Sequence, residues 1–289
     1  MKKYLKSFIA VLTIVSMAVL AGCGSSGDTS SDKTASNGKS TARNVEQIKQ
    51  SGEVIIGVFS DKAPFGYVDA NGKYQGYDVY FAERIGKDLG VKIKYVSLDP
   101  ANRVEYLKTG KVDIVLANFT VTKERAEVVD FALPYMKVAL GVVSKNGQYT
   151  SAEQLNGKTL IVAKGTTAET YFTKNHPEVK LLKFDQYTET YNALLDGRGD
   201  AFSTDNTEVL AWAKNNPGFA VGIPNLGDID TIAPAVQKGN VDLLNWLNEE
   251  IKTLGKEKFF HANYEVTLKN VYGDTVNPDD LVVEGGELK

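Results

Sequence analysis

From Asn44 onward, short runs of β-branched residues alternate with helical segments, and this alternation constrains the fold more than any other feature of the sequence. Residues 53–59 and 112–117 (VDIVLA) read as buried strands, and residues 78–89 between them read as a helix that stops at Gly90. The second half of the chain repeats the pattern. Strands separated by helices of about ten residues favour parallel pairing in an α/β layer architecture. The sequence therefore predicts an α/β fold.

The length of 289 residues is enough for roughly two domains with a sizeable core. The net charge is −3, so the chain has no basic field of the kind that binds nucleic acid. One cysteine and two histidines exclude a disulfide framework and argue against a Cys/His zinc site. We therefore expect no cofactor, no metal and no nucleic-acid partner.

The N-terminus has the pattern of a secretory signal peptide. Lysines within the first six residues precede an apolar run from Phe8 to Ala21, which is short for a ~30 Å hydrocarbon core. The run ends in small residues before Cys23, an arrangement that resembles the bacterial lipobox. Residues 1–22 are thus predicted to be removed and Cys23 to be diacylated. The alternative is a secreted protein with a chance cysteine at this position.

Residues 23–43 are predicted to form a lipidated N-terminus and a flexible tether. Their side chains are mostly Ser, Gly, Thr and other polar groups, which cannot bury enough apolar surface to offset the entropy of ordering. Two acyl chains are enough for stable anchoring. We therefore expect a globular head held by lipid on the outer face of the cytoplasmic membrane.

The head is predicted to consist of two α/β lobes. Residues 44–142 and 237–289 are assigned to lobe 1, and residues 143–236 to lobe 2. The chain is expected to pass between the lobes near residues 142–148 and again near residues 231–238. Two crossings make a hinge, and the gap between the lobes becomes the natural ligand cleft.

Arg125 is the first candidate ligand-binding residue. It follows a buried strand and a polar segment that contains Thr120, and Thr122 is placed to cap a helix that begins there. From this position the guanidinium can bind a carboxylate in bidentate fashion, with Thr120 and nearby backbone N–H groups as further donors. The alternative is a surface arginine paired with Glu124 or Asp130.

Two further segments place polar groups between a strand and a helix. Gly165 allows a tight turn, and Thr166 and Thr167 expose N–H groups that suit an anion, although a plain helix cap is the alternative. Asp205 either caps the helix that follows it or pairs with an ammonium group. Arg125 and Asp205 on opposite lobes would bind the two charges of an amino acid, and the closed form would then be stable only with ligand.

The segment after the first strand and the next helix supply the remaining candidates. Phe65 and Tyr67 could form a wall of the pocket, with Lys62 at its rim. Arg103 and Tyr106 could reach the side-chain end of the ligand. The alternatives are core aromatic residues, a solvent-facing arginine and a half-buried tyrosine.

Together these motifs resemble the family 3 extracellular solute-binding proteins, the polar amino-acid receptors of ABC importers. The resemblance rests on residues 64–67 (PFGY), 76–79 (GYDV), 112–114 (VDI), 120–125 (TVTKER), 129–131 (VDF) and 134–135 (PY). It implies a two-lobe periplasmic-binding-protein-like fold of type II, with a two-strand hinge and a ligand cleft between the lobes. It also implies that Arg125 binds the α-carboxylate and Asp205 the α-amino group. Backbone contacts are implied for Asn118, Thr120 and Thr167.

Within the family, the chain is similar to a cysteine-binding subgroup. The similarity lies in residues 101–107 (ANRVEYL), 116–120 (LANFT), 135–142 (YMKVALGV) and 165–168 (GTTA). It implies L-cysteine as ligand, the transmembrane subunits of an ABC permease as partner, and a monomer. Arg103 and Lys62 keep aspartate or glutamate open as ligands, and glutamine and cystine also remain alternatives.

Two other classes of function remain as alternatives: a secreted dehydratase built on the same fold, and a surface adhesin. Ser/His/Asp catalysis would have to use His176 or His261, which lie beside bulky neighbours at a helix end or within a helix, and a dehydratase would need a buried carboxylic acid or similar group in the cleft. We therefore expect a binding protein rather than an enzyme.

Overall fold

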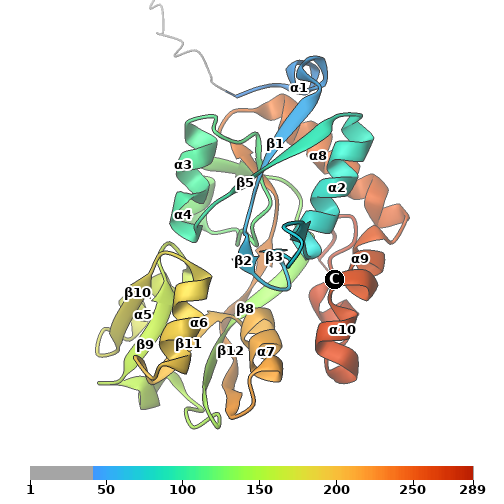
Figure 1. Ribbon diagram of the computed structural model, residues 1–289. Helices are drawn as coiled ribbons and strands as arrows, with labels where there is room; N and C mark the ends of the chain where they lie inside the picture. Colours follow the sequence, from blue (N-terminus) through green and yellow to red (C-terminus); the bar gives the residue numbers. More distant parts are fainter. Residues whose placement is uncertain (1–41, 289) are drawn as a thin grey trace, which may run out of the picture. The chain divides into compact units, whose positions relative to one another are not determined.

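The structure is a computed structural model that describes residues 42–288 of the chain (Figure 1). The described residues form one compact unit. The predicted signal peptide, the predicted lipidation site at Cys23 and nearly all of the predicted tether lie outside the described residues. Among residues 42–288, no helix has the length and apolar character needed to cross a bilayer.

The first lobe is built on a five-stranded sheet in the order β5-β1-β6-β13-β7. Its strands are β1 (Glu53–Val58), β5 (Lys92–Ser97), β6 (Ile114–Val115), β7 (Val129–Phe131) and β13 (Ala235–Gln237). β1 pairs in parallel with β5 and β6, as the alternation of strands and helices predicts. β13 pairs antiparallel with β6 and β7, so a late segment of the chain returns to this sheet.

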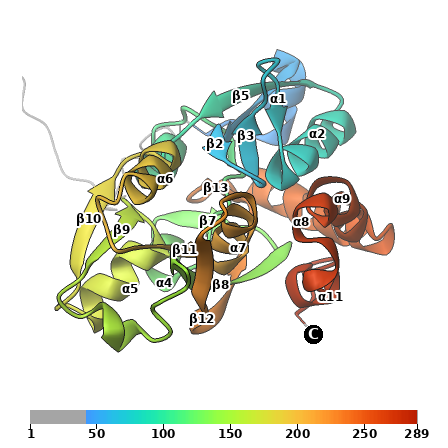
Figure 2. The same cartoon turned by 60° about the horizontal axis from the view of Figure 1, so that its bottom comes forward.

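Helices from both ends of the chain cover this sheet. They are α1 (Val45–Ser51), α2 (Tyr77–Leu89), α3 (Arg103–Lys108), α4 (Lys123–Ala126), α8 (Val241–Lys256) and α9 (Phe259–Thr267). Asn44 caps α1 with its side chain, and Gly90 ends α2 in the left-handed conformation that glycine adopts without strain. The C-terminal helices lie beside α2 and share one apolar core with it (Figure 1, Figure 2).

A small sheet follows β1 and lies where the two lobes meet. It consists of β2 (Asp61–Lys62), β3 (Gly66–Val68) and β4 (Tyr74–Gln75). β3 and β4 contact α2 of the first lobe, whereas β2 contacts α6 of the second lobe. Asp61 accepts a hydrogen bond of 3.0 Å from the backbone N–H of Thr188 in the first turn of α6. This short strand therefore links the two lobes directly.

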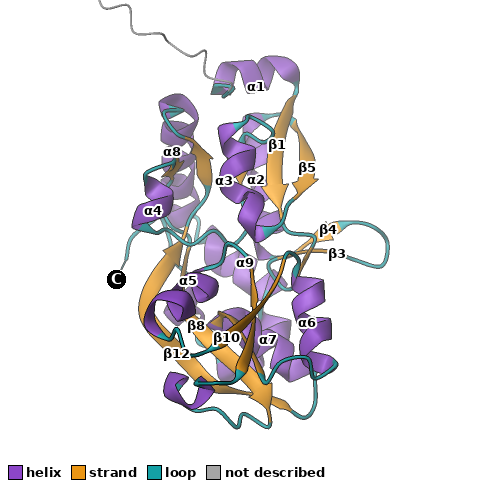
Figure 3. Ribbon diagram, turned by 90° about the vertical axis from the view of Figure 1, so that its left-hand side faces the viewer, coloured by secondary structure: helices purple, strands orange, loops and turns teal. Residues whose placement is uncertain are grey.

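The second lobe has its own five-stranded sheet, in the order β10-β9-β11-β8-β12. Its strands are β8 (Met136–Lys145), β9 (Thr159–Ala163), β10 (Lys180–Phe184), β11 (Ala201–Asp205) and β12 (Phe219–Ile232), and its helices are α5 (Thr167–Asn175), α6 (Tyr187–Leu195) and α7 (Asn206–Asn215). β9 pairs in parallel with β10 and β11. β8 pairs antiparallel with β11 and β12, so the sheet contains two long strands that are not predicted from the sequence (Figure 3).

β8 and β12 also form the two-strand hinge between the lobes. Met136 pairs with Ile232 at the end of the β8–β12 ladder, and Ile232 in turn forms a bridge with Thr120. Met136 forms a second bridge with Val282, close to the helices α10 (Lys269–Tyr272) and α11 (Pro278–Leu281). The strand pairing thus carries the chain from one sheet to the other twice. The lobe boundaries at residues 142/143 and 236/237 stay a prediction, and β8 already pairs within the second sheet from Met136.

Candidate ligand-binding site

Arg125 lies where the two lobes meet. The Oγ1 atom of Thr122 accepts a hydrogen bond of 3.2 Å from the backbone N–H of Arg125. Thr122 thus caps the short helix α4, as predicted. The guanidinium Nη1 donates to the carbonyl oxygen of Thr120 at 2.8 Å, and Nη2 donates to the carbonyl oxygen of Gly165 at 2.9 Å. Gly165 belongs to the turn between β9 and α5, so Arg125 joins the first lobe to the second.

The surface ion pair considered as an alternative for Arg125 is wrong. Glu124 pairs with Lys174 at 3.2 Å, and Asp130 pairs with Lys238 at 2.7 Å. Both carboxylates therefore have other cationic partners.

Arg103 lies next to Arg125 and is buried, so a solvent-facing arginine is also wrong. Its Nη2 donates to the carbonyl oxygen of Gly165 at 3.1 Å, the same oxygen that Arg125 contacts. The other donors of Arg103 meet carbonyl oxygens of Pro100, Ala117 and Asn118. Both guanidinium groups also lie over the ring of Phe119, at 4.5 Å for Arg103 and 4.9 Å for Arg125.

The two arginines make this part of the site strongly positive. Burial and, to a smaller extent, the neighbouring charge of Arg103 lower the pKa of Arg125 to about 9. Burial also lowers the pKa of Arg103. Among residues 42–288, neither guanidinium has a carboxylate within ion-pair distance, and every hydrogen bond they make is to a neutral carbonyl. A partly desolvated pair of cations of this kind favours an anionic group.

Asp205 ends β11 on the opposite side of the site, and its side chain does not cap α7, so the capping alternative is wrong. Its Oδ2 atom accepts hydrogen bonds from Lys62 Nζ at 2.7 Å and from Asn118 Nδ2 at 3.0 Å. Asn118 adopts a left-handed conformation with φ 44°, which places its amide beside Asp205. The first lobe thus holds this carboxylate of the second lobe through two side chains.

Lys62 is fully buried rather than at the rim of a pocket. Its side chain is 1% exposed, and its Nζ atom lies 2.7 Å from Asp205 Oδ2 and 2.9 Å from Glu208 Oε2. The ring of Tyr187 lies 4.7 Å from the same ammonium. Although burial opposes its charge, the two carboxylates raise the pKa of Lys62 well above its ordinary value. Lys62 is therefore a permanently charged partner of the second lobe.

Sequence reasoning missed two buried carboxyl groups of this site, Glu208 and Asp78. Glu208 accepts hydrogen bonds from Thr204 at 3.0 Å and from Tyr191, and burial raises its pKa to about 7. The spacing of Asp205 and Glu208, three residues apart at the start of a helix, was a signal that both lie on one face.

Asp78 lies in the first turn of α2 and supports the strand end that carries Asn118. It accepts hydrogen bonds from the backbone N–H of Asn118 at 2.7 Å and from the hydroxyl of Tyr135 at 2.6 Å. Burial raises the pKa of Asp78 to about 6. Its place in the motif of residues 76–79 is the signal in the sequence that points to it.

The remaining predicted residues divide into three groups. Thr167 lines a cavity of about 520 Å³ together with Arg125, whereas Thr166 uses its hydroxyl to cap α5 and to donate to Ala163. Phe65 is buried in the core of the first lobe, with its ring 5.8 Å from Lys62 Nζ, and Tyr67 is half-buried on β3. Tyr106 packs instead against Lys111, whose Nζ lies 3.5 Å from its ring. The structure does not bring Tyr106 into the cluster.

The charged groups of the site balance one another. Lys62, Arg103 and Arg125 supply three positive charges, and three acidic side chains oppose them: Asp78, Asp205 and Glu208. The two guanidinium groups converge on the carbonyl oxygen of Gly165, whereas Asp205 and Glu208 converge on the ammonium of Lys62. A ligand with one charge of each sign and no net charge fits this arrangement.

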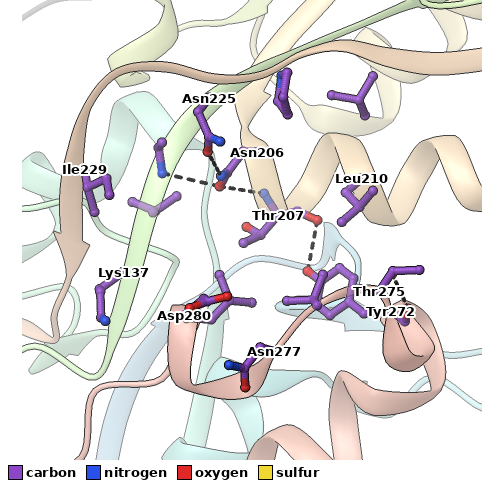
Figure 4. A pocket seen from close by; sticks show the side chains of 16 residues that line it. Lys137, Asn206, Thr207, Leu210, Asn225, Ile229, Tyr272, Thr275, Asn277 and Asp280 are labelled. Carbon is purple, nitrogen blue, oxygen red and sulfur yellow. Dashed lines mark hydrogen bonds between the residues drawn. The ribbon is translucent and has the colours of Figure 1, made fainter.

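A larger hollow of about 630 Å³ lies beside the hinge, between α7, the start of β8 and residues 272–281 (Figure 4). Tyr272 donates its hydroxyl to the carbonyl oxygen of Thr207 there at 2.9 Å. No predicted site residue lines this hollow. Within the part of the chain that the structure describes, no group of His, Cys, Asp and Glu residues is arranged to hold a metal ion.

Comparison with known proteins reveals close similarity to one family. The sequence model of bacterial extracellular solute-binding proteins, family 3, matches residues 54–266. A solved structure of the solute receptor for L-cysteine of Neisseria gonorrhoeae is 60% identical, with a TM-score of 0.82, covering 84% of this chain and 100% of that chain. The cysteine-binding protein of Campylobacter jejuni is 55% identical with the same TM-score and coverage. The glutamine-binding protein of Geobacillus stearothermophilus is 32% identical over 222 residues, which are 74% of this chain and 85% of that protein.

Proposed function

The chain belongs to the family 3 bacterial extracellular solute-binding proteins, and on that premise we propose that it is the amino-acid receptor of an ABC importer. The observation that carries this proposal is the separation of charge across the junction of the lobes. Two guanidinium groups without a carboxylate partner among residues 42–288 lie at one end, and Asp205 lies at the other. Only a group that carries both charges satisfies both ends at once.

We assign the α-carboxylate of the ligand to Arg125, with Arg103 as the neighbouring cation, and the α-ammonium group to Asp205. A bidentate guanidinium–carboxylate pair is both strong and directional. Thr120, Asn118 and Thr167 are proposed as backbone or hydroxyl contacts around it, and Phe65 and Tyr67 as apolar walls. Since the two charged ends belong to different lobes, binding would favour the closed arrangement of the lobes.

L-cysteine is the proposed ligand. The receptors at 55–60% identity are described as binding cysteine, and the site agrees with a ligand whose side chain is uncharged. Lys62 is already paired with Asp205 and Glu208, so its ammonium is not available to an acidic side chain. This weakens the case for aspartate and glutamate, and leaves glutamine and cystine as the alternatives to test.

We propose a binding protein without catalytic activity. A dehydratase on this fold would need an acid that can reach the ligand. Glu208 accepts from Lys62 and Thr204 on one oxygen and from Tyr191 on the other, and Asp78 accepts on both of its oxygens. These two carboxyl groups with raised pKa values are therefore occupied by the protein.

The proposed setting is extracytoplasmic, with delivery of the ligand to the transmembrane subunits of a permease. Removal of residues 1–22 and acylation of Cys23 would hold the protein as a lipid-anchored monomer on the outer face of the cytoplasmic membrane. Residues 23–43 would then act as the tether that lets the head reach the permease.

Isothermal titration calorimetry of the purified protein tests the proposal. L-cysteine under reducing conditions, L-cystine, L-glutamine and L-aspartate are titrated in turn. We expect L-cysteine to bind with micromolar or tighter affinity, about −8 kcal/mol or more favourable. Trp212 stacks on Tyr191, which donates to Glu208, so its fluorescence should change with the same midpoint. Absence of heat and of a fluorescence change with all four ligands would overturn the proposal.

A further inference from the structure

Lys62 places a buried ammonium group beside Asp205, although the binding of a zwitterion requires only Arg125 and Asp205. It lies between two carboxylates of the second lobe, Asp205 and Glu208, although it belongs to β2 beside the first lobe. Burial of a lysine is costly unless its charge is paired, and here two acids pair with it. The aromatic rings of Phe59, Phe65 and Tyr187 lie 4.7–5.8 Å from the ammonium and add cation–π attraction to the two ion pairs.

Asp205 has one oxygen in use and one to spare. Lys62 and Asn118 both donate to Oδ2. Among residues 42–288, Oδ1 of Asp205 accepts no hydrogen bond, whereas Oδ2 accepts two. The ligand's ammonium therefore has an acceptor at Oδ1 while Lys62 keeps Oδ2.

Charge counting gives this pairing a consequence for specificity. Above the pKa of Glu208, which is about 7, Asp205 and Glu208 carry two negative charges, and Lys62 neutralises one of them. The negative end of the site is thus left with a single charge, enough for one ammonium group. Without Lys62 the same end would have a second negative charge, which would attract a ligand with a second cation.

From this geometry we infer that Lys62 is a specificity-determining residue that excludes amino acids with a basic side chain by occupying the second cation position. The inference rests on the proposed function, because it assigns the α-ammonium to Asp205. Glu208 is the counterpart of Lys62 in this role and the reason that a second cation position exists. Lys62 also positions Asp205, so the test must separate a change of ligand preference from a general loss of affinity.

The test compares L-cysteine with L-2,4-diaminobutyrate, a short amino acid with a second ammonium group, by calorimetry in one buffer at a pH above 7, so that Glu208 is ionised. The proteins are the wild type, Lys62→Met and the double variant Lys62→Met/Glu208→Gln. Lys252→Met is the matched control, because Lys252 forms an exposed ion pair with Glu249 at 2.7 Å on α8. The quantity of interest is the ratio of the two dissociation constants.

We expect Lys62→Met to shift this ratio toward diaminobutyrate by about tenfold or more, and the added Glu208→Gln substitution to reverse most of the shift. Lys252→Met should leave the ratio unchanged. An equal loss of affinity for both ligands in Lys62→Met, or a shift that Glu208→Gln does not reverse, would overturn the inference.

A single Glu208→Gln variant keeps the inference testable if Lys62→Met does not fold. It leaves Lys62 with Asp205 alone, so discrimination against diaminobutyrate should increase, and an unchanged ratio would contradict us. Failure of the wild-type protein to bind L-cysteine or any other amino acid would instead count against the proposed function.

Discussion

The Nζ atom of Lys62 lies 2.7 Å from Oδ2 of Asp205, and this buried ion pair joins a strand beside the first lobe to the strand end of the second. The neighbouring residue Asp61 holds the N-terminus of α6 through Thr188. On the other side of the site, Arg125 reaches the carbonyl oxygen of Gly165. The lobes therefore meet through charged and polar groups around the proposed ligand position, so ligand binding and lobe contact depend on the same residues.

Arg125→Lys should lower the affinity for the ligand by about tenfold or more. Lysine keeps the charge but loses the fork that binds a carboxylate in bidentate fashion, and it cannot reach Thr120 and Gly165 together. Calorimetry with L-cysteine measures the loss. Lys123→Met, an exposed position on the same helix, serves as the control and should bind as the wild type does. Unchanged affinity in Arg125→Lys would remove Arg125 from the site.

Gly165→Ala should weaken ligand binding because it holds the lobes apart. A Cβ atom at Gly165 would lie 2.6 Å from the Cα atom of Ala101 in the first lobe. Gly157→Ala is the matched control, since Gly157 has nearly the same φ (75° against 73°) and nothing within 4 Å of its added Cβ. Both variants should lose about 1 kcal/mol of stability in urea denaturation. Only Gly165→Ala should lose affinity, and an equal loss in both would refute the contact.

Glu208 should make the stability of the protein depend on pH. Burial raises its pKa from the ordinary 4.5 to about 7, so the folded protein keeps a proton that the unfolded chain releases. The free energy of unfolding should therefore fall as the pH rises from about 4.5 to 7, and this contribution should level off above 7. Urea denaturation of wild type and Glu208→Gln across this range measures the effect. The variant should show a shallower fall, and parallel curves would contradict the shifted pKa.

Cys23→Ser should release the protein from the membrane. Serine cannot take the thioether-linked lipid, so fractionation of cells should move the protein from the membrane fraction to the soluble extracytoplasmic fraction. The matched control is Ser25→Ala, which leaves the cysteine intact and should remain membrane-bound. A Cys23→Ser protein that stays in the membrane fraction would show that the anchor lies elsewhere.

Much of the fold could be predicted from the sequence, because the regular alternation of strands and helices covers most of the head. Strand β1 and helix α2 lie within one residue of the predicted ranges 53–59 and 78–89, and α2 ends before Gly90 as predicted. The strands β8 and β12 could not be predicted in this way. β12 has bulges between Val221 and Asp230, which break the alternation that identifies a strand.

Less of the site than of the fold could be predicted from the sequence. The motif around Arg125 and the strand end at Asp205 indicated where charged groups would gather, and the structure places both at the junction of the lobes. Lys62 could not be placed correctly, because its burial depends on the second lobe meeting β2. Glu208 resembled any acidic residue in the first turn of a helix, and only the approach of Lys62 distinguishes it.

The most direct test of the account changes the ligand instead of the protein, either by removing one of its charged groups or by inverting their arrangement around the α-carbon. Calorimetry compares L-cysteine with D-cysteine, with cysteamine, which lacks the carboxylate, and with 3-mercaptopropionate, which lacks the amino group. If a zwitterion is held between Arg125 and Asp205, each of the three analogues should bind at least about tenfold more weakly than L-cysteine. An analogue that binds as tightly as L-cysteine would contradict the account.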